Sequence, residues 1–150
     1  MDGAIGTQLR HVLELIDGDV AKVYLELGLP EYRPRFSPIV RTLVAEGPLS
    51  IRDLARAVGV THSAASQTVA QLTKSGFVSL EPGTDARQRI VHLTGKTREL
   101  LPTIEAEWQA TTAAMSALDE ELSAPLSIVL SELVAAVERR PFRTRIADHT

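Results

Sequence analysis

The segment from Ile51 to Leu72 constrains the fold of this chain more than any other. It has the sequence IRDLARAVGVTHSAASQTVAQL, in which two apolar-periodic stretches flank a turn at Gly59. Two helices that cross closely need a small residue at their contact, here Ala55, and a glycine where the chain turns. We expect the packing residues to be Leu54, Val58, Val60, Ala65, Val69 and Leu72. The pattern predicts a helix-turn-helix.

Two further helices are predicted before this motif. Apolar residues recur at three- and four-residue spacing from Ile5 to Leu27, which is typical of a long amphipathic helix, and Gly28 follows. A shorter helix is expected over residues 37–45, with Ser37 as its N-cap and Pro38 in its first turn.

The motif itself and the segment after it divide into two helices and a hairpin. The first helix is expected over residues 49–58 with Ser50 as N-cap, and the second over residues 61–75, capped by its first residue. Residues 77–81 and 89–93 are β-prone runs on either side of a Pro-Gly-Thr-Asp turn. They predict a β-hairpin directly after the helix-turn-helix.

Two long helices are predicted in the remaining chain. One is expected over residues 94–118, capped by Thr94 and interrupted or bent at Pro102, and the other over residues 123–139. The last helix has a wide apolar face made of Ile128, Leu130, Leu133, Val134 and Val137. The two terminal helical regions are too apolar to serve one small domain alone, which favours a homodimer.

The second helix of the motif has a polar outer face without an acidic residue. A helix against a phosphate backbone cannot tolerate carboxylates at its contact positions, whereas glutamine can pair with adenine and lysine with phosphate. The expected DNA contacts in and beside the motif are Ser50, Thr61, His62, Ser63, Ser66, Gln67, Gln71 and Lys74. The alternative is an ordinary helical hairpin with a polar face.

The tip of the hairpin gives a second, independent signal. It carries Thr84 and two close arginines, Arg87 and Arg89, which we also expect to contact DNA. Arginine on such a projection can enter a narrow minor groove, where the negative potential is enhanced. Asp85 would repel DNA unless it were paired, so we expect an ion pair with Arg87 or Arg89 that shapes the loop. The alternative is a surface hairpin with an incidental ion pair.

The distribution of charge agrees with a DNA-binding middle segment. The whole chain has a formal net charge of -3, which alone argues against a nucleic-acid binder. Residues 33–98, however, hold ten basic and four acidic side chains, a net of +6, while residues 1–32 sum to -4 and residues 99–150 to -5. One basic surface could attract phosphate while acidic flanks keep the protein soluble, although the asymmetry could also be chance.

Several classes of protein are disfavoured by composition. Cysteine is absent, which excludes disulfides, thiolate metal sites and cysteine-based redox sensing. The four histidines lie far apart, so no metal or cofactor is expected, and no phosphate-binding loop or paired nucleophile and base suggests an enzyme. The acidic run Asp119-Glu120-Glu121 is interpreted as a solvated loop or helix start. No apolar run is long enough to span a membrane, and we expect a cytoplasmic protein.

The sequence resembles the MarR (multiple antibiotic resistance regulator) family of winged-helix regulators over nearly the whole chain. The likeness lies in LARAVGVTHSAASQTVAQLTKSGFV, in the DAR segment of the hairpin, and in VHLTGKTRELL at the start of the fifth helix. Its most specific parts are Asp85 with Arg87, and Leu93 followed by Thr94. The chain departs from the family at Thr97, where glycine is common, and Ala86 and Gln67 are found where arginine is common.

The resemblance implies a mainly α-helical fold with a small β-wing, a winged helix-turn-helix in a six-helix dimer. Residues 1–150 would form a single chain with a DNA-binding lobe at residues 33–93, and residues 1–32 and 94–150 would dimerise. The expected function is a homodimeric DNA-binding transcriptional regulator, most simply a repressor, on a pseudo-palindromic operator. The resemblance leaves two alternatives for its control: no effector at all, or a small organic effector that binds in a pocket between the dimer interface and the lobe and weakens operator binding.

Two questions stay open at the level of sequence. Five residues could line the effector pocket or simply belong to the core: Tyr24, Tyr32, Phe36, Arg41 and Trp108. The alternative function is a winged-helix module that dimerises and binds protein rather than DNA. Loss of Arg87 would leave the function of such a module intact.

Overall fold

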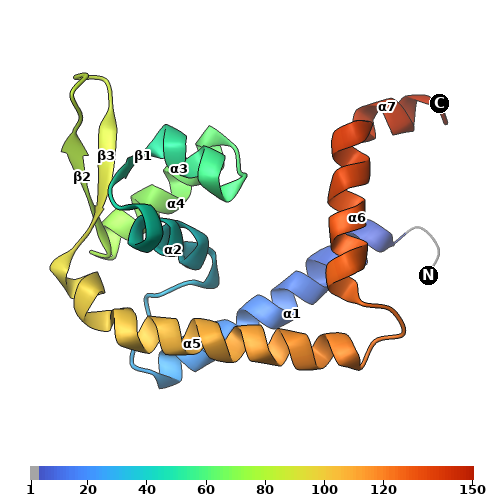
Figure 1. Ribbon diagram of the computed structural model, residues 1–150, viewed down its shortest axis with the longest axis horizontal. Helices are drawn as coiled ribbons and strands as arrows, with labels where there is room; N and C mark the ends of the chain where they lie inside the picture. The colour runs from blue at the N-terminus through green and yellow to red at the C-terminus, as the bar shows by residue number, and fades with distance from the viewer. Residues whose placement is uncertain (1–3) are drawn as a thin grey trace. The chain divides into compact units, whose positions relative to one another are not determined.

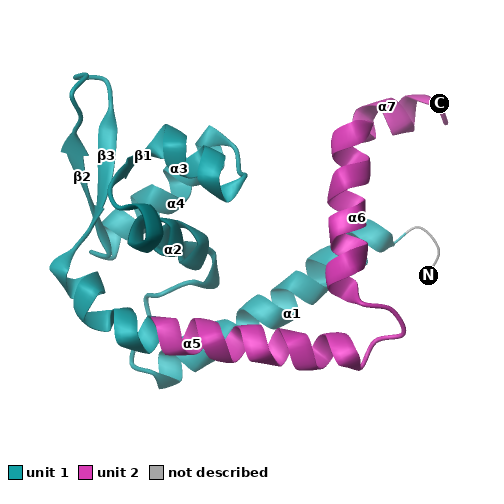
Figure 2. Ribbon diagram, in the orientation of Figure 1, with its two compact units in different colours: residues 1–104 teal, residues 105–150 magenta. Residues whose placement is uncertain are grey.

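The computed structural model describes residues 4–150, which are mostly helical and include one small antiparallel sheet (Figure 1). The winged-helix fold class expected from the sequence is therefore confirmed. The chain divides into two compact units, one ending at Ile104 and the other formed by Glu105–Thr150 (Figure 2). The helix α5 (Gly95–Glu120) contributes residues to both units.

The first unit holds three helices around a three-stranded sheet, preceded by a long helix and a short 3-10 helix. Its elements are α1 (Ile5–Glu26), η1 (Pro34–Phe36), α2 (Ser37–Glu46), β1 (Leu49–Ser50), α3 (Ile51–Val58), α4 (His62–Lys74), β2 (Val78–Pro82) and β3 (Arg89–Leu93). The strand order is β1-β3-β2, and both pairings are antiparallel. The hairpin β2–β3 is the wing.

The helix-turn-helix forms from α3 and α4 as the sequence predicts. The hydroxyl of Ser50 accepts a hydrogen bond from the backbone N–H of Asp53 at 3.1 Å, and that of Thr61 accepts from Ala64 at 3.1 Å. Each cap satisfies a backbone donor that the first turn of a helix leaves without a partner. Gly59 has φ +78°, the left-handed conformation that glycine adopts without steric cost.

The core of the helix-turn-helix contains most of the expected packing residues. Leu54, Ala55, Ala65, Val69 and Leu72 are buried. Val58 is half-buried, and Val60, with 43% of its surface exposed, was wrongly placed in the core. The backbone N–H of Val60 bonds to the carbonyl of Ala55 at the turn, which closes the helix end while the side chain stays in solvent.

An aromatic cluster joins the first helices to the start of the wing. Tyr32 lies at the centre, with ring centroids 4.5 Å from Tyr24, 5.7 Å from Phe36 and 5.4 Å from Phe77. All four side chains are almost fully buried. Tyr24, Tyr32 and Phe36 are therefore core residues, the simpler of the two interpretations considered above.

Three expected helix features are corrected by the structure. Ser37 is not an N-cap: α2 continues directly from η1, and the buried Ser37 hydroxyl lies 3.2 Å from the hydroxyl of Tyr32. Residues 49 and 50 form β1 rather than the first turn of α3, because they pair with Val91 and Ile90 of β3. Of the two outcomes expected at Pro102, an interruption is ruled out, because α5 continues through this residue to Glu120.

The second unit contains most of α5 and two further helices, α6 (Leu126–Arg139) and α7 (Phe142–Ala147). The Asp119 carboxylate accepts hydrogen bonds from the backbone N–H of Leu126 and from the Ser127 hydroxyl, which fixes the start of α6 three residues later than expected. Arg145 of α7 donates a hydrogen bond to the carbonyl of Ala136 at 2.9 Å, which ties α7 to α6.

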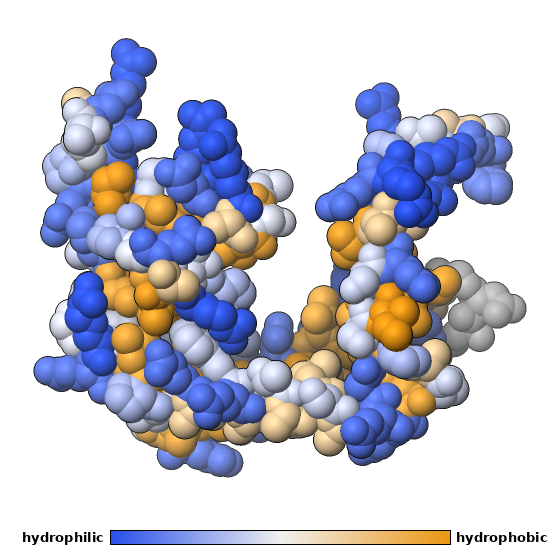
Figure 3. All heavy atoms as spheres, in the orientation of Figure 1, coloured by the Kyte–Doolittle hydropathy of each residue, from blue (hydrophilic) through white to orange (hydrophobic). Residues whose placement is uncertain are grey.

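Neither α6 nor α7 buries a residue within the described chain. Figure 3 shows hydrophobic side chains along α6 that are open to solvent. Within residues 4–150, no helix is long and apolar enough to cross a membrane.

Candidate nucleic-acid interface

Helix α4 turns its polar face to solvent and its apolar face to the core. Its buried residues are Ala65, Val69 and Leu72. The expected DNA contacts on the opposite face are exposed except Ser66, which is half-buried: they are His62, Ser63, Gln67, Gln71 and Lys74. No carboxylate lies on this helix, and Lys74 adds a positive charge at its last turn. A surface of this kind can approach a phosphate backbone without repulsion.

Two expected contacts have structural roles in positioning this helix. Ser50 is buried, with 7% of its surface exposed, and its hydroxyl caps α3. Thr61 is exposed, and its hydroxyl caps α4. Any contact that either residue makes with DNA has to use a hydroxyl already engaged with the backbone.

The wing loop is exposed throughout from Thr84 to Arg89. Figure 1 shows it at the far end of the β2–β3 hairpin, and Figure 3 shows a hydrophilic surface there. Asp85 does not form the expected ion pair with an arginine: among the described residues, its carboxylate accepts a hydrogen bond from the backbone N–H of Arg87 at 3.1 Å. The short side chain of Asp85 favours this local turn. The positions of the Arg87 and Arg89 side chains are therefore set by the backbone of the loop and not by an ion pair with Asp85.

A close backbone approach further fixes the loop. The backbone N–H of Gly83 bonds to the carbonyl of Gln88 at 3.0 Å, and Gln88 donates to the carbonyl of Asp85 at 2.9 Å. A Cβ atom on Gly83 would lie 2.9 Å from Cβ of Gln88, too close for any larger residue without a shift. The arginines are therefore presented by a defined turn.

Two nearby carboxylates, those of Glu81 and Asp53, lie close to basic side chains. Glu81 on β2 lies 3.3 Å from Nε2 of His92 across the wing, and Asp53 lies 4.0 Å from Arg56 within α3. Within residues 4–150, the arginines of the wing loop and Lys74 form no ion pair with a carboxylate. The exposed surface of this lobe is thus positive where α4 and the wing tip lie.

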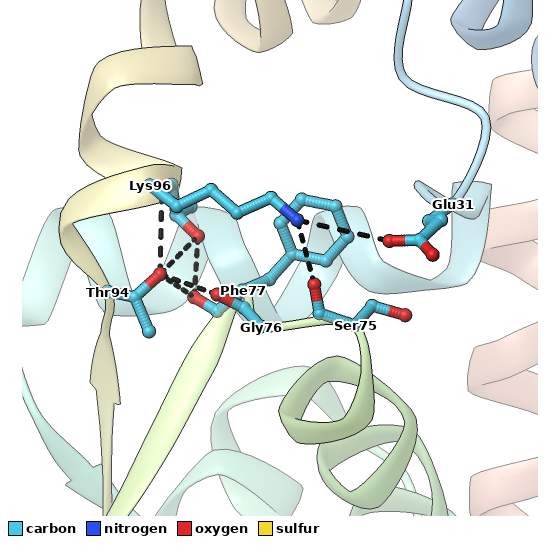
Figure 4. A network of polar contacts seen from close by, with 7 residues as sticks. Glu31, Ser75, Gly76, Phe77, Thr94 and Lys96 are labelled. Atoms are coloured by element: carbon cyan, nitrogen blue, oxygen red, sulfur yellow. Dashed lines mark hydrogen bonds and ion pairs between the residues drawn. The ribbon is translucent and has the colours of Figure 1, made fainter.

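Two threonines attach the end of α4 to the start of α5 (Figure 4). The Thr94 hydroxyl donates to the carbonyl of Gly76 at 2.7 Å, and the Thr97 hydroxyl donates to the carbonyl of Phe77 at 2.6 Å. Thr97, at a position where the family resemblance leads us to expect glycine, is fully buried. These links join residues far apart in the chain, so no local sequence pattern reports them.

Within the described residues, no group of three or more histidine or acidic side chains could hold a metal ion.

The chain is similar in sequence to one known protein family and in fold to a set of solved structures. A family model described as the MarR family matches residues 37–88, from α2 to the wing loop. Comparison with curated protein sequences gave no match.

Three solved structures illustrate the likeness. Reduced AbfR bound to DNA has a TM-score of 0.67 and 20% identity over 90% of this chain and 91% of its own. The transcriptional regulator PcaV from Streptomyces coelicolor, in complex with its natural ligand, has a TM-score of 0.62 and 21% identity over 93% of this chain and 92% of its own. NMB1585, a MarR family regulator from Neisseria meningitidis, has a TM-score of 0.59 and 16% identity over the full length of both chains. At these identities the likeness is one of fold.

Proposed function

Because residues 37–88 belong to the MarR family and the whole chain has the fold of that family's regulators, we propose that this protein is a homodimeric transcriptional regulator that binds double-stranded DNA. One observation carries the proposal: the acid-free polar face of α4 is accompanied by a wing loop that holds two exposed arginines. The proposal assigns the chain no catalytic activity.

In this function the polar face of α4 enters the major groove, and we call α4 the recognition helix from here on. Gln67 and Gln71 read base edges, and Lys74 binds phosphate. The wing loop places Arg87 and Arg89 in the adjacent minor groove. Residues 33–93 make up the DNA-binding lobe in this proposal.

The homodimer is supported by apolar side chains that the single chain leaves in solvent. Helix α1 buries only Tyr24 among its described residues, and α6 buries none. The exposed large apolar residues of these helices are Ile5, Leu9, Val12, Leu13, Leu15, Val23, Leu25, Ile128, Val129, Leu130, Leu133, Val134 and Val137. Exposed apolar surface of this extent is typical of an interface, and its burial is the main driving force for association.

Dimerisation through residues 1–32 and 94–150 pairs two recognition helices around a two-fold axis. The operator is then a pseudo-palindrome whose half-sites lie about one helical turn apart. Binding across a promoter blocks transcription, so the simplest role is that of a repressor.

A small organic effector that weakens DNA binding is the second part of the proposal. A cavity of about 440 Å³ lies between α1 and η1, and its lining includes Arg33, Arg35, Glu14 and Asp17. Guanidinium groups suit the carboxylate of an organic acid. Screening aromatic and aliphatic acids for release of a fluorescent operator, with Arg35→Ala as the variant that should lose the response, tests this part separately.

The central experiment selects duplexes from a randomised pool with the wild-type protein and then measures their affinity by fluorescence anisotropy across a salt series. Arg87→Ala should weaken binding and reduce the salt dependence, because an arginine close to phosphates displaces counterions. Lys22→Ala on α1 removes the same charge from an exposed side chain outside the helix-turn-helix and wing. Once sedimentation has shown that this variant is still a dimer, both quantities should be unchanged. Salt-dependent, sequence-selective binding supports the proposal. If no duplex is enriched, DNA regulation is wrong and the protein-binding alternative takes its place.

A further inference from the structure

The amino group of Lys96 sits where three segments of the first unit meet (Figure 4). Lys96 belongs to the first turn of α5, and its Nζ donates a hydrogen bond to the carbonyl of Ser75 at 2.9 Å. The same atom lies 4.7 Å from the ring centroid of Phe77 and 3.9 Å from Oε2 of Glu31. The three partners come from the end of the recognition helix, the start of the wing and the segment after α1.

Each contact suits a cation. Ser75 is the C-cap of the recognition helix, and its carbonyl lies at the negative end of the helix dipole. The face of the Phe77 ring attracts a positive charge, and Glu31 supplies a full negative charge. The Lys96 side chain is half-exposed, and three convergent partners favour one of the many rotamers that such a lysine can adopt.

The position of Lys96 gives these contacts a consequence for DNA binding. Its backbone lies at the start of α5, and its amine donates a hydrogen bond to the carbonyl of Ser75, the C-cap of the recognition helix. Thr94 and Thr97 bind the next two carbonyls, those of Gly76 and Phe77, so the joint between recognition helix and α5 is held at successive points. Of these three side chains, only that of Lys96 also reaches Glu31.

We propose that Lys96 is a positioning residue that sets the direction of the recognition helix relative to the start of α5, and thereby the half-site spacing that the dimer accepts. This inference rests on the proposed function. It assigns Lys96 no contact with DNA, because the amine points to Ser75 and Glu31 rather than to the polar face of the recognition helix.

A lysine that binds phosphate and a lysine that positions a helix differ in salt dependence. Loss of a phosphate contact lowers the slope of log affinity against log salt by about 0.9 for each lysine, or about 1.8 for a dimer. Loss of a positioning contact weakens binding without changing that slope. Lys74 is the matched control, because it is the same residue type at the end of the recognition helix and is expected to contact phosphate.

The experiment uses the full-length protein and a duplex selected by the wild type from a randomised pool, with two further duplexes whose centre is one base pair longer or shorter. Lys96→Met should weaken binding to the selected duplex about threefold, because the Lys96 side chain is half-exposed and water screens its contacts. The variant should also discriminate less between the three spacings and keep the wild-type salt slope. Lys96→Arg, which retains charge and donors, should restore affinity and spacing preference.

Lys74→Met should lower the salt slope and leave the spacing preference intact. A reduced slope for Lys96→Met would show a phosphate contact, and unchanged affinity with unchanged spacing preference would show no role; either result overturns the inference. If Lys96→Met fails to fold, as judged by circular dichroism, Glu31→Gln decides instead. It removes one partner of the amine and should relax the spacing preference in the same direction. Failure of the wild type to select any duplex, by contrast, refutes the proposed function itself.

Discussion

Replacing Thr97 with valine should lower the free energy of unfolding by about 1 kcal/mol, whereas the same change at Thr112 should cost close to nothing. Both hydroxyls lie on α5 and donate to a backbone carbonyl, Thr97 to Phe77 at 2.6 Å and Thr112 to Trp108 at 2.8 Å. The difference is burial: Thr97 has 0% of its surface exposed, while the Thr112 bond lies in solvent.

The magnitude follows from the partners that remain in the Thr97 variant. The carbonyl of Phe77 also accepts a bond from the backbone N–H of Thr94 at 3.2 Å. The Thr97 hydroxyl also lies 3.2 Å from the hydroxyl of Thr94, which keeps the carbonyl of Gly76 as its acceptor. Because both partners keep another bond, the variant loses roughly the net value of one hydrogen bond, about 0.5–1.5 kcal/mol, and not the larger penalty for a buried unsatisfied group. At Thr112, water replaces the hydroxyl as a donor to the carbonyl.

Urea unfolding of the two variants and the wild type at one protein concentration measures the difference, because association makes stability depend on concentration. The slope of unfolding free energy against urea should be the same for all three proteins. Thr97→Ser retains the hydroxyl and serves as a control for the lost bond. Equal midpoints for the two valine variants would refute the reasoning, since burial would then make no difference.

Two further predictions concern the cap of α3 and the apolar face of α6. Ser50→Ala should destabilise the protein by about 1 kcal/mol, because Asp53 loses its N-cap acceptor, and Ser50→Thr, which keeps a hydroxyl acceptor, should recover most of that loss in urea unfolding. Leu133→Glu should convert the proposed dimer to a monomer in sedimentation experiments while leaving helix content unchanged, because α6 buries no residue within the described chain. Ser131→Glu, on the same helix with the same added charge, should remain dimeric; dissociation of both variants would contradict the assignment of the interface to the apolar face.

Local signals were enough to predict the helix-turn-helix and the wing. The left-handed turn at Gly59 and the caps at Ser50 and Thr61 depend on residues within a few positions of one another. A local sequence pattern is therefore enough to predict them. The polar face of α4 follows from helical periodicity once its apolar residues are known. These features determine which side chains the lobe exposes.

Long-range pairing explains what the sequence did not predict. Strand β1 has only two residues and exists because Leu49 faces Val91, forty-two positions later, which no local pattern reports. Ser37 looks like an N-cap, yet the buried hydroxyl of Tyr32 takes it as a partner. The contact of Lys96 with Ser75 likewise spans 21 residues and depends on the tertiary fold. The carboxylate of Asp85 accepts a hydrogen bond from the backbone N–H of Arg87 rather than pairing with the guanidinium of that residue.

Titration of the wild-type protein into a selected duplex and into a shuffled duplex of the same composition tests the central claim most directly. The account predicts two chains bound for each selected duplex, and an affinity for it about a thousandfold or more above that for the shuffled one at physiological salt. Equal affinity for the two duplexes, or one chain bound per site, would contradict the account of a dimer that reads DNA sequence through its recognition helices.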